Sequence, residues 1–508
     1  MKILTAAQRK DADNFTIAGG TPEQTLIERA AKAVSEYLIS RCERGSRIQI
    51  YCGQGNNGAD GLAVARLLKK RAYDPRVFIV NHRKDTSKQF SAQAERLRAM
   101  QTVPVYELTD QSTLPEHNKD TIIVDALLGS GISGAVADDS LLATVITHIN
   151  SHEGLTVSID VPSGMLMDER TDGIAVAADH VITFERPPLA FLLRDNEDFV
   201  GSFDIAHTGI SHKFMEELPG QFYWTTREVA GKLLRTNIRR VFSDKRDYGH
   251  SYIIAGAKGT YGAAVLAARG ALVAGSGKVS ARVPAAAHDI LLNALPEVMV
   301  LADGSKTIIT DSGFDPDRFT VTGIGPGIGT HHDTAEMLED LLARSELDTK
   351  LVLDADALNI LADEPEMLDM LPPGTVLTPH AGEFERLAGS WRDGFELLDA
   401  LQGFVATHNI TVVLKGHYTM VALASGQVHF NSSGNPGMAT AGTGDALLGI
   451  ITGLIAQGWS PEEAAILGAY IHGLAGDIAA QKHSQLAMRA SDLLDEVGAA
   501  FMNLNVQE

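Results

Sequence analysis

A glycine-rich segment that ends in an aspartate lies near the C-terminus, at residues 435–445, and an apolar stretch follows it directly. Gly442, Thr443 and Gly444 occupy the positions at which a loop would enter a helix. The first N–H groups of a helix have no intrahelical partner and carry partial positive charge, so a phosphate oxyanion fits there. Asp445 would hold a carboxylate beside that anion, where it can deprotonate a hydroxyl that attacks a phosphoryl group. The segment predicts phosphoryl-transfer chemistry rather than the commoner alternative, a glycine turn with an aspartate cap.

Other loops of the C-terminal half also follow apolar runs that are typical of strands; they lie at 256–262, 323–329, 353–359, 378–385 and 415–419. In a doubly wound sheet, such loops meet at the carboxyl ends of the strands, and ligands bind there. Lys415 can reach a nucleotide phosphate as a point charge, and His380 is expected to face the same cleft. For the loop at 256–262, a phosphate site that uses Lys258 and a plain strand–helix turn stay equally open.

The N-terminal half carries a second set of polar loops. Residues 53–61 read Gly-Gln-Gly-Asn-Asn-Gly-Ala-Asp-Gly and separate an apolar run from a helical pattern. This spacing is not the G-x-G-x-x-G dinucleotide fingerprint, yet its asparagines and aspartate exceed what a turn needs. The loops 125–134 and 158–164 end two further apolar runs, so the three loops are expected to meet in one cleft. Asp125 and Asp160 would point into it as a carboxylate pair that can bind a cation or move a proton, with Asp160 the better catalytic candidate.

Short apolar runs alternate with helical patterns along the chain, which predicts an α/β fold of two three-layer αβα domains, the first of them Rossmann-like. Several runs are apolar throughout, as strands buried on both faces of a parallel sheet are. The predicted strands are 47–52, 76–80, 121–126, 155–159, 180–184, 203–205, 251–255, 278–281, 319–323, 351–354, 375–378 and 411–414. The pattern breaks at 220–227, which is typical of a connection, and we place the domain boundary near 215–226.

Length and composition limit the possible classes of protein. The 508 residues exceed one ordinary core, so two or more domains are expected. A formal charge of −21 disfavours nucleic acid and anionic membranes as partners. Two cysteines exclude a disulfide scaffold and make a reducing compartment the default. The N-terminus becomes charged too early for a signal peptide and the apolar runs are too short to span a bilayer, so a cytoplasmic protein is expected.

The segment at 435–445 resembles the anion-hole signature of the ribokinase-like superfamily. With the motifs G-P-G-x-G, L-D-A-D-A-L, T-P-H-x-G-E and K-G-x-x-T, residues 226–508 resemble the dehydratase domain of bifunctional NAD(P)H-hydrate repair enzymes. The resemblance implies a ribokinase-like αβα fold with Asp445 as the catalytic residue. It implies that the hydrated nicotinamide nucleotide is bound by Gly327, His380 and Asp445. The adenine nucleotide would be bound by Lys415, Gly416, His417, Tyr418, Thr419, Gly442, Thr443 and Gly444.

Residues 1–215 resemble the epimerase domain of the same family. The family loop is usually G-x-G-N-N-G-G-D-G, and here Ala59 replaces one glycine. The resemblance implies that Asp160 acts on the substrate and that Asn57, Asp125 and Ser163 coordinate a potassium ion, for which oxygen-only ligands are suited. The implied substrate-binding residues are Asn56, Asn57, Gly58, Ala59, Asp60, Gly129, Ser130, Gly131, Ile132, Ser133, Gly134, Ala135 and Asp160.

The two resemblances, in this order in one chain, imply the repair of hydrated NADH and NADPH (NADHX and NADPHX). The N-terminal domain would interconvert the R and S forms at C6, and the C-terminal domain would dehydrate the S form with ADP and Mg²⁺, releasing AMP and phosphate. The compact chain without a targeting segment favours ADP, the nucleotide of bacterial members, over ATP. A homo-oligomer is expected from the family.

Three alternatives remain at this level. A vitamin or sugar kinase with an appended ligand-binding domain would leave a stable phosphoester, whereas a dehydratase leaves free phosphate. A nucleotide-sensing scaffold would bind without turnover. A conventional dehydrogenase is disfavoured by the missing G-x-G-x-x-G.

Overall fold

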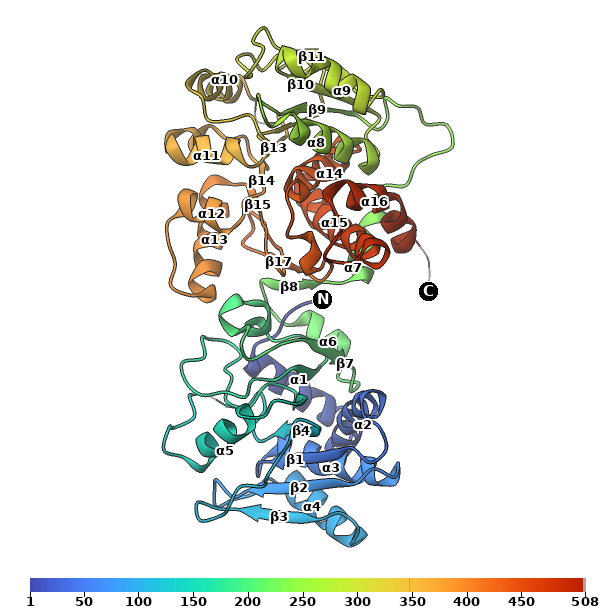
Figure 1. Cartoon of the computed structure of the whole chain (residues 1–508), viewed down its shortest axis with the longest axis vertical. Coiled ribbons are helices and arrows are strands. Elements are labelled where there is room, and N and C mark those ends of the chain that lie inside the picture. The colour runs from blue at the N-terminus through green and yellow to red at the C-terminus, as the bar shows by residue number, and fades with distance from the viewer. Residues whose placement is uncertain (133, 347, 506–508) are drawn as a thin grey trace. The chain divides into compact units, whose positions relative to one another are not determined.

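The computed structural model describes residues 1–132, 134–346 and 348–505. The chain divides into two compact units (Figure 1). The N-terminal unit is Lys2–Gly220 with Asp393–Phe395, and the C-terminal unit is Gln221–Arg392 and Glu396–Glu508 with Met1.

The described part of the N-terminal unit is built on a seven-stranded sheet in which every strand pairs with its neighbours in parallel. The strands, in spatial order, are β3 (Val105–Leu108), β2 (Pro75–Val80), β1 (Arg47–Cys52), β4 (Thr121–Ala126), β5 (Thr156–Ile159), β6 (His180–Phe184) and β7 (Phe203–Ala206). Its helices are α1 (Ala6–Ala18), α2 (Glu23–Arg41), α3 (Asn56–Lys70), α4 (Lys88–Met100), α5 (Leu141–Asn150) and α6 (His212–Glu217). The strand order reverses between β1 and β4, and the crevice beyond the carboxyl ends at such a point is where ligands bind.

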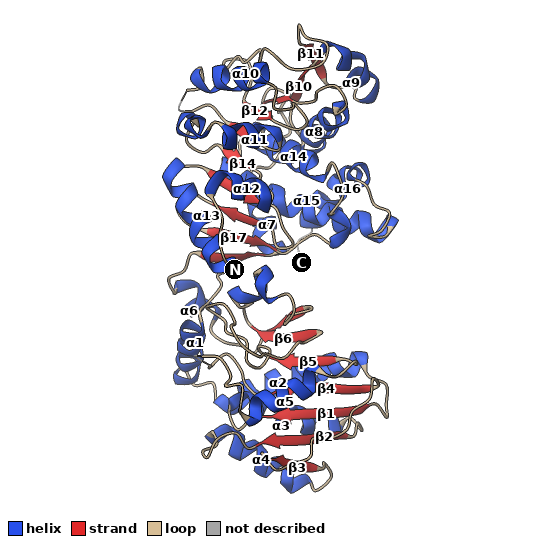
Figure 2. Cartoon of the chain, turned by 60° about the vertical axis from the view of Figure 1, so that its left-hand side comes forward, coloured by secondary structure: helices blue, strands red, loops and turns tan. Residues whose placement is uncertain are grey.

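Helices cover both faces of this sheet, as Figure 2 shows. Ile27 of α2, Leu62 of α3 and Leu97 of α4 share one buried apolar cluster with the sheet. Ile146 of α5 belongs to the cluster on the other face. Because both faces are covered, the central strands are apolar on both sides, which is why their sequences show no alternation. The predicted three-layer αβα class is confirmed.

The C-terminal unit is built on a ten-stranded sheet among the described residues. Its strands, in spatial order, are β11 (Met299–Ala302), β10 (Lys278–Val283), β9 (His250–Ile254), β12 (Val321–Ile324), β13 (Leu351–Leu353), β14 (Val376–Leu377), β15 (Thr411–Leu414), β16 (Met420–Ala422), β17 (Val428–Asn431) and β8 (Phe222–Thr225). Pairing is parallel except for β16, which is antiparallel to β15 and β17. The helices are α7 (Arg227–Leu234), α8 (Tyr261–Ala274), α9 (His288–Ala294), α10 (His332–Ala343), α11 (Asp356–Asp363), α12 (Ala381–Ala388), α13 (Gly394–His408), α14 (Thr443–Ala456), α15 (Pro461–His483) and α16 (Ala490–Asn505).

Helix α14 lies unusually close to α8, and small residues make this possible. A Cβ added at Gly449 would lie 2.1 Å from the carbonyl oxygen of Ala267, and one added at Gly453 would lie 2.7 Å from that of Ala271. The alanine- and glycine-rich composition of both helices therefore reflects backbone contact. This packing fixes the start of α14.

Three sequence expectations differ from the structure. Residues 220–227, expected as a connection, contain the edge strand β8, which pairs with β17. Residues 56–61, expected as a loop, form the first turns of α3. Helix α1 was not anticipated, although Thr5 and Gln8 form a capping box at its start.

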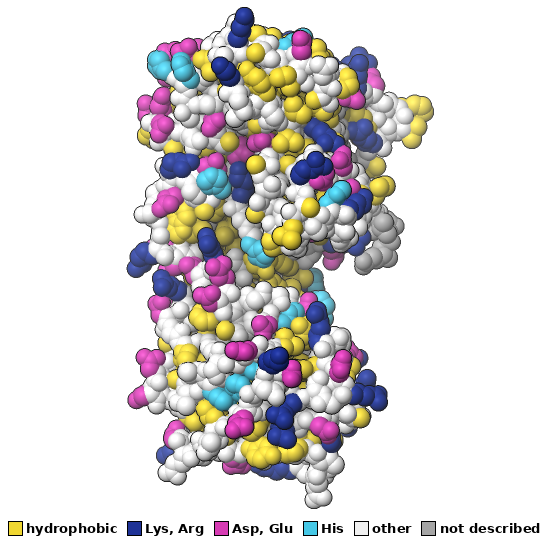
Figure 3. All heavy atoms as spheres, viewed as in Figure 1, with side chains coloured by type: hydrophobic (Ala, Val, Ile, Leu, Met, Phe, Trp, Pro, Cys, Tyr) yellow, Lys and Arg dark blue, Asp and Glu magenta, His cyan; other side chains and the backbone are white. Residues whose placement is uncertain are grey.

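On the face seen in Figure 3, acidic and basic side chains are interspersed over both units. Within the described ranges, no helix has the length and apolar character needed to cross a membrane.

Candidate active sites

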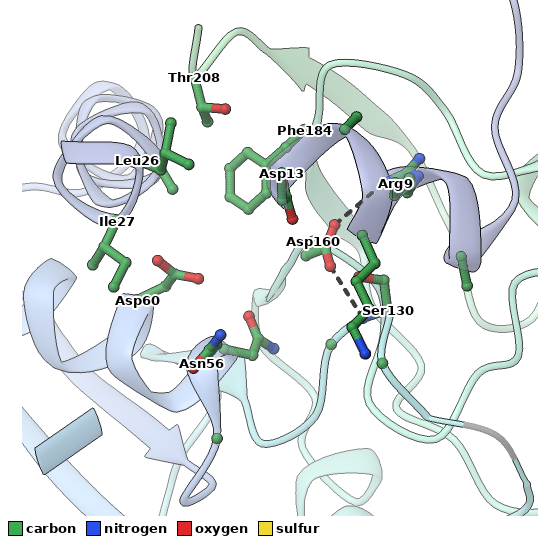
Figure 4. A pocket seen from close by; sticks show the side chains of 18 of the residues that line it. Arg9, Asp13, Leu26, Ile27, Asn56, Asp60, Ser130, Asp160, Phe184 and Thr208 are labelled. Atoms are coloured by element: carbon green, nitrogen blue, oxygen red, sulfur yellow. Dashed lines mark hydrogen bonds and ion pairs between the residues drawn. The ribbon is translucent and has the colours of Figure 1, made fainter. Parts of the chain in front are cut away.

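A cavity of about 740 Å³ lies in the N-terminal unit, at the carboxyl ends of β1, β4 and β5 (Figure 4). The residues implied by the resemblance that line it are Asn56, Asn57, Asp60, Gly129, Ser130, Gly131, Ile132 and Asp160. Ser133 lies outside the described residues. The three loops therefore meet in one cleft, as the sequence predicted.

Four of the implied substrate-binding residues do not line the cavity. Ala59 is fully buried inside the unit, and a Cβ at Gly58 would lie 1.8 Å from the carbonyl oxygen of Gly53. Gly58 therefore allows the close approach of α3 to the residue that follows β1. Gly134 and Ala135 are exposed and lie outside the lining.

Asp160 follows β5 and has a φ of +68°, a conformation that non-glycine residues seldom adopt. Its Oδ2 accepts a hydrogen bond of 3.1 Å from the N–H of Ser130, and its Oδ1 lies 3.5 Å from the Arg9 guanidinium. Figure 4 shows that Arg9 and Ser130 contact the two oxygens of this carboxylate from different sides. Backbone strain of this kind concentrates at functional sites, and here it directs an ion-paired carboxylate at the cavity.

Arg9 and Asp13 of α1 also line the cavity, and sequence reasoning missed both. They are four residues apart, so they share one face of the helix. The Arg9 guanidinium also donates to the carbonyl oxygen of Arg186. The capping box at Thr5 was the signal that could have predicted the helix and, with it, this charged face.

Several carboxyl groups lie close together in the cavity, and this raises the pKa of two of them, Asp13 and Asp60. Burial raises the pKa of Asp60 well above its usual value, and the nearby charges of Asp160 and Asp13 add to the effect. Burial, followed by the Asp160 charge, raises the pKa of Asp13 to about 6. Asp13 has appreciable accessible area, but this area faces the cavity, whose walls limit its solvation. The site can therefore hold neutral and ionised carboxyl groups together near neutral pH.

Beneath the cavity, oxygen atoms of three loops form a compact buried cluster. The Asp125 carboxylate accepts hydrogen bonds from the hydroxyls of Ser158 and Ser163 and from backbone N–H groups, at 2.5–3.2 Å. The Ser163 hydroxyl also lies 3.1 Å from the carbonyl oxygen of Leu128, which accepts from the amide of Asn57 at 2.6 Å. Asp125 thus lies under the cavity and does not point into it, contrary to the sequence expectation, because its donors hold it inward. Asn57 Oδ1 is buried with no hydrogen-bond partner among the described residues.

In the C-terminal unit, α14 begins at Thr443 after Gly442, which has a φ of +92°. Ala446 donates to the carbonyl of Gly442, so the N–H groups of Thr443 to Asp445 precede the hydrogen-bond ladder of the helix. Burial, followed by the charge of Asp354, raises the pKa of Asp445 to about 6. The expected helix start with a carboxylate beside it is therefore present.

Lys415 follows β15 and reaches this helix start. Its Nζ lies 2.7 Å from Oδ1 of Asp354, a side chain that is 1% exposed, and 3.8 Å from Oε2 of Glu383. A Cβ added at Gly444 would lie 3.3 Å from Nζ of Lys415 and 3.4 Å from Oδ2 of Asp354. Ala355, which precedes α11, has a φ of +51°. Backbone strain therefore lies next to the buried carboxylate of Asp354, as it does at Asp160.

The other implied residues lie at the carboxyl ends of neighbouring strands. His380 follows β14, pairs with Lys415 in an isolated bridge and caps α12, where its Nδ1 accepts from the N–H of Glu383 at 3.1 Å. Gly327 follows β12 with a φ of +62° and contacts Thr260 through its carbonyl oxygen. Residues 415–419 form the turn after β15, in which Thr419 donates to the carbonyl of Gly416.

The Thr443 hydroxyl and the His472 imidazole stabilise the start of α14. The Thr443 hydroxyl donates to the carbonyl oxygens of Met438 and Thr440, so it belongs to the loop. His472 of α15, missed from the sequence, contacts the Thr443 carbonyl at 2.9 Å, and burial lowers its pKa to about 4. A neutral imidazole that donates to this carbonyl holds the first turn in place.

Two family models match the chain. The model of NAD(P)H-hydrate dehydratase matches residues 251–498, and the model of the YjeF-related protein N-terminus matches residues 23–190. Among solved structures, a ribokinase-like superfamily protein from Enterococcus faecalis has a TM-score of 0.50 and 26% identity, covering 56% of this chain and 98% of that chain. An ADP/ATP-dependent NAD(P)H-hydrate dehydratase from Bacillus subtilis, co-crystallised with ATP/Mg²⁺, has a TM-score of 0.48 and 27% identity, covering 56% and 98%.

Full-length relatives cover both units. The bifunctional NAD(P)H-hydrate repair enzyme of Moorella thermoacetica is 35% identical over 525 residues, which cover 99% of this chain and 97% of that protein. The enzyme of the same description from Escherichia coli is 33% identical, covering 92% of this chain and 87% of that protein. The chain belongs to the family of bifunctional NAD(P)H-hydrate repair enzymes.

Proposed function

We propose that this chain repairs hydrated NADH and NADPH in two steps. The N-terminal domain, residues 1–215, interconverts the R and S forms at C6. The C-terminal domain, residues 226–508, dehydrates the S form with ADP and releases AMP and phosphate. The observation that carries the proposal is the placement of Asp445, a carboxylate of raised pKa, in the first turn of α14 near Lys415.

Dehydration begins when Asp445 accepts the proton of the 6-hydroxyl, whose oxygen attacks the terminal phosphate of ADP. The N–H groups at the start of α14 and the ammonium of Lys415 stabilise the negative charge that develops on the transferred phosphoryl group. AMP leaves, the C6–O bond of the phosphate ester breaks, and loss of a C5 proton restores the dihydropyridine. Mg²⁺ supplied with ADP would neutralise part of the charge on the phosphates during this transfer.

The nucleotide would bind at Lys415–Thr419 and at Gly442–Gly444, and the hydrated nicotinamide at Gly327 and His380. All of these follow β12, β14 or β15 or begin α14, so a ligand at that edge of the sheet could contact them together. His380 presents an imidazole that is 55% exposed, which leaves it accessible to a ligand.

Epimerisation requires an acid–base group that moves a proton at the oxygen bound to C6, and Asp160 is the proposed residue. Arg9 keeps its carboxylate ion-paired, and Ser130 orients it toward the cavity. The substrate would lie against Asn56, Asp60 and the loop at 129–132, which line the same space.

Potassium would supply a fixed positive charge beneath the substrate. The unpartnered Oδ1 of Asn57, the Ser163 hydroxyl and the Asp125 carboxylate form an oxygen-only donor set of the kind that suits a hard monovalent cation. The residues present therefore fit the group that the family implies.

The test is an absorbance assay for reduced nicotinamide on an R/S mixture of NADHX with Mg²⁺ and K⁺, with ADP and ATP supplied separately. Recovery of the whole mixture with ADP supports both activities and the choice of ADP. Recovery of the S fraction alone would reject the epimerase assignment. A stable phosphoester in place of free phosphate would instead support the kinase alternative.

A further inference from the structure

Asp13 occupies a position in the N-terminal cavity that the proposed mechanism leaves unused. It lines the cavity from α1, and Figure 4 shows its carboxyl group directed toward Asp160, next to Phe184. Arg9, one turn earlier on α1, contacts Asp160 from the other side. Asp13 and Asp160 therefore face one reaction space, and Asp160 is the one paired with Arg9.

The charges around Asp13 come from each element that surrounds it. Arg9 lies on α1, Glu23 on α2 and Asp60 on α3, while Asp160 follows β5 and Glu185 follows β6. The basic side chains that line the same cavity are Arg9, Lys10, Arg83 and Arg186. Arg9, which pairs with Asp160, lowers the pKa of Asp13 by its charge, and Arg186 pairs with Glu216. Burial and the charges of three carboxylates, Asp160, Glu185 and Glu23, outweigh the charge of Arg9, and the pKa of Asp13 is raised.

We propose that Asp13 is a second catalytic residue of the epimerase site, the acid that protonates the departing C6 hydroxyl, with Asp160 as the base that receives a proton from the returning water. The inference rests on the epimerase function proposed above. It assigns different roles to two carboxyl groups that the cavity places together: the one that pairs with Arg9 receives a proton and the other supplies one.

The step balances without any further reactant. The Asp13 carboxyl gives its proton to the C6 hydroxyl oxygen, the C6–O bond breaks with its electron pair on oxygen, and water leaves. The lone pair of N1 forms a C6=N1 double bond, whose positive charge the surrounding carboxylates stabilise. Water adds to the other face of C6 and gives a proton to Asp160. Proton transfer from Asp160 back to Asp13 restores the starting state.

The experiment measures epimerisation by the full-length chain without ADP, so that dehydration does not contribute. Purified (R)-NADHX is incubated with K⁺, and the R and S forms are separated by chromatography at a series of pH values. Wild type is compared with Asp13→Asn, with Asp13→Glu, with Asp60→Asn and with the matched control Asp11→Asn. Asp11 is exposed on the same helix and lies outside the cavity lining.

Because Asp13 must be protonated to act, the wild-type rate is expected to fall as pH rises through about 6. Asp13→Asn should lower the rate by roughly 100-fold or more and abolish that pH dependence, because an amide carries no transferable acid proton. Asp13→Glu should retain part of the rate and the falling limb, which also shows that position 13 tolerates substitution. Asp11→Asn should match wild type.

Three results would overturn the inference. Asp13→Asn at wild-type rate would remove Asp13 from the reaction. If Asp13→Asn is slower but its rate still falls as pH rises, Asp13 is a positioning residue. If Asp60→Asn alone loses this fall in rate, the acid is Asp60. Absence of epimerisation by wild type above the uncatalysed rate would reject the proposed function of this domain, which distinguishes that failure from a failure of Asp13.

Discussion

The ammonium of Lys415 lies 2.7 Å from a carboxylate oxygen of Asp354, and this buried ion pair adjoins the first turn of α14. A phosphoryl group bound at that turn would meet a lysine already held in place by a second residue. Asp354 also raises the pKa of Asp445 through its charge. One carboxylate thus positions the cation and keeps the proposed base near its working range.

Asp445→Asn should reduce dehydration of (S)-NADHX by roughly 100-fold or more, because the general base is lost while the N–H groups of α14 remain. Recovery of NADH from the S form in the presence of ADP measures this. Asp340→Asn, an exposed change on α10, is the control. Epimerisation should be unaffected, and near-normal dehydration by Asp445→Asn would remove it from the mechanism.

The pH dependence of dehydration follows from the raised pKa of Asp445. A general base must be ionised, so kcat is expected to fall as pH decreases through about 6. Asp354→Asn removes one of the charges that raise this pKa, so the falling limb should move to lower pH in that variant. If kcat of Asp354→Asn falls at the same pH as kcat of wild type, another group controls this pH dependence.

Lys415→Met should lower kcat/KM for ADP by about 100-fold, because a preorganised positive charge at the phosphoryl group is lost. It also leaves Asp354 buried without its partner, which should cost about 1–3 kcal/mol of unfolding free energy. Denaturant unfolding should show that the double variant Asp354→Asn, Lys415→Met recovers stability without recovering activity. Lys306→Met, on an exposed loop of the same unit, is the control. Equal stability of Lys415→Met and wild type would contradict a stabilising ion pair between Lys415 and Asp354.

Asp160→Asn should abolish epimerisation while dehydration of the S form continues. Asparagine tolerates the positive φ of this position better than most residues, so the change tests the charge rather than the backbone. Asp160→Ala should add a loss of thermal stability, since alanine is strained there. Unaltered exchange of R and S forms in Asp160→Asn would exclude Asp160 as the acid–base group.

Replacement of K⁺ by Li⁺ should slow epimerisation and leave dehydration unchanged, because the oxygen cluster under the cavity lies in the N-terminal unit alone. Asn57→Ala should raise the K⁺ concentration for half-maximal activation by at least roughly tenfold. Asn56→Ala, at the neighbouring position, should retain the K⁺ response. If Asn57→Ala responds to K⁺ like wild type, the cation binds elsewhere.

The sequence by itself determined the fold class and most strands of both sheets, because strands covered on both faces are apolar throughout and hence recognisable. It also indicated which segments to propose for the chemistry: the start of α14, Lys415 and the segments that hold Asn57 and Asp160 follow predicted strands or open predicted helices. These features depend on local composition and spacing, which need no knowledge of distant contacts.

Only the tertiary structure decided which charges meet. Arg9 and Asp160 are 151 positions apart and Asp354 and Lys415 are 61 apart, so no local pattern pairs them. The inward placement of Asp125 and the contact of His472 with the start of α14 were hidden for the same reason. The edge strand β8 was missed because its partner β17 follows some 200 residues later, and strand pairing is a non-local interaction.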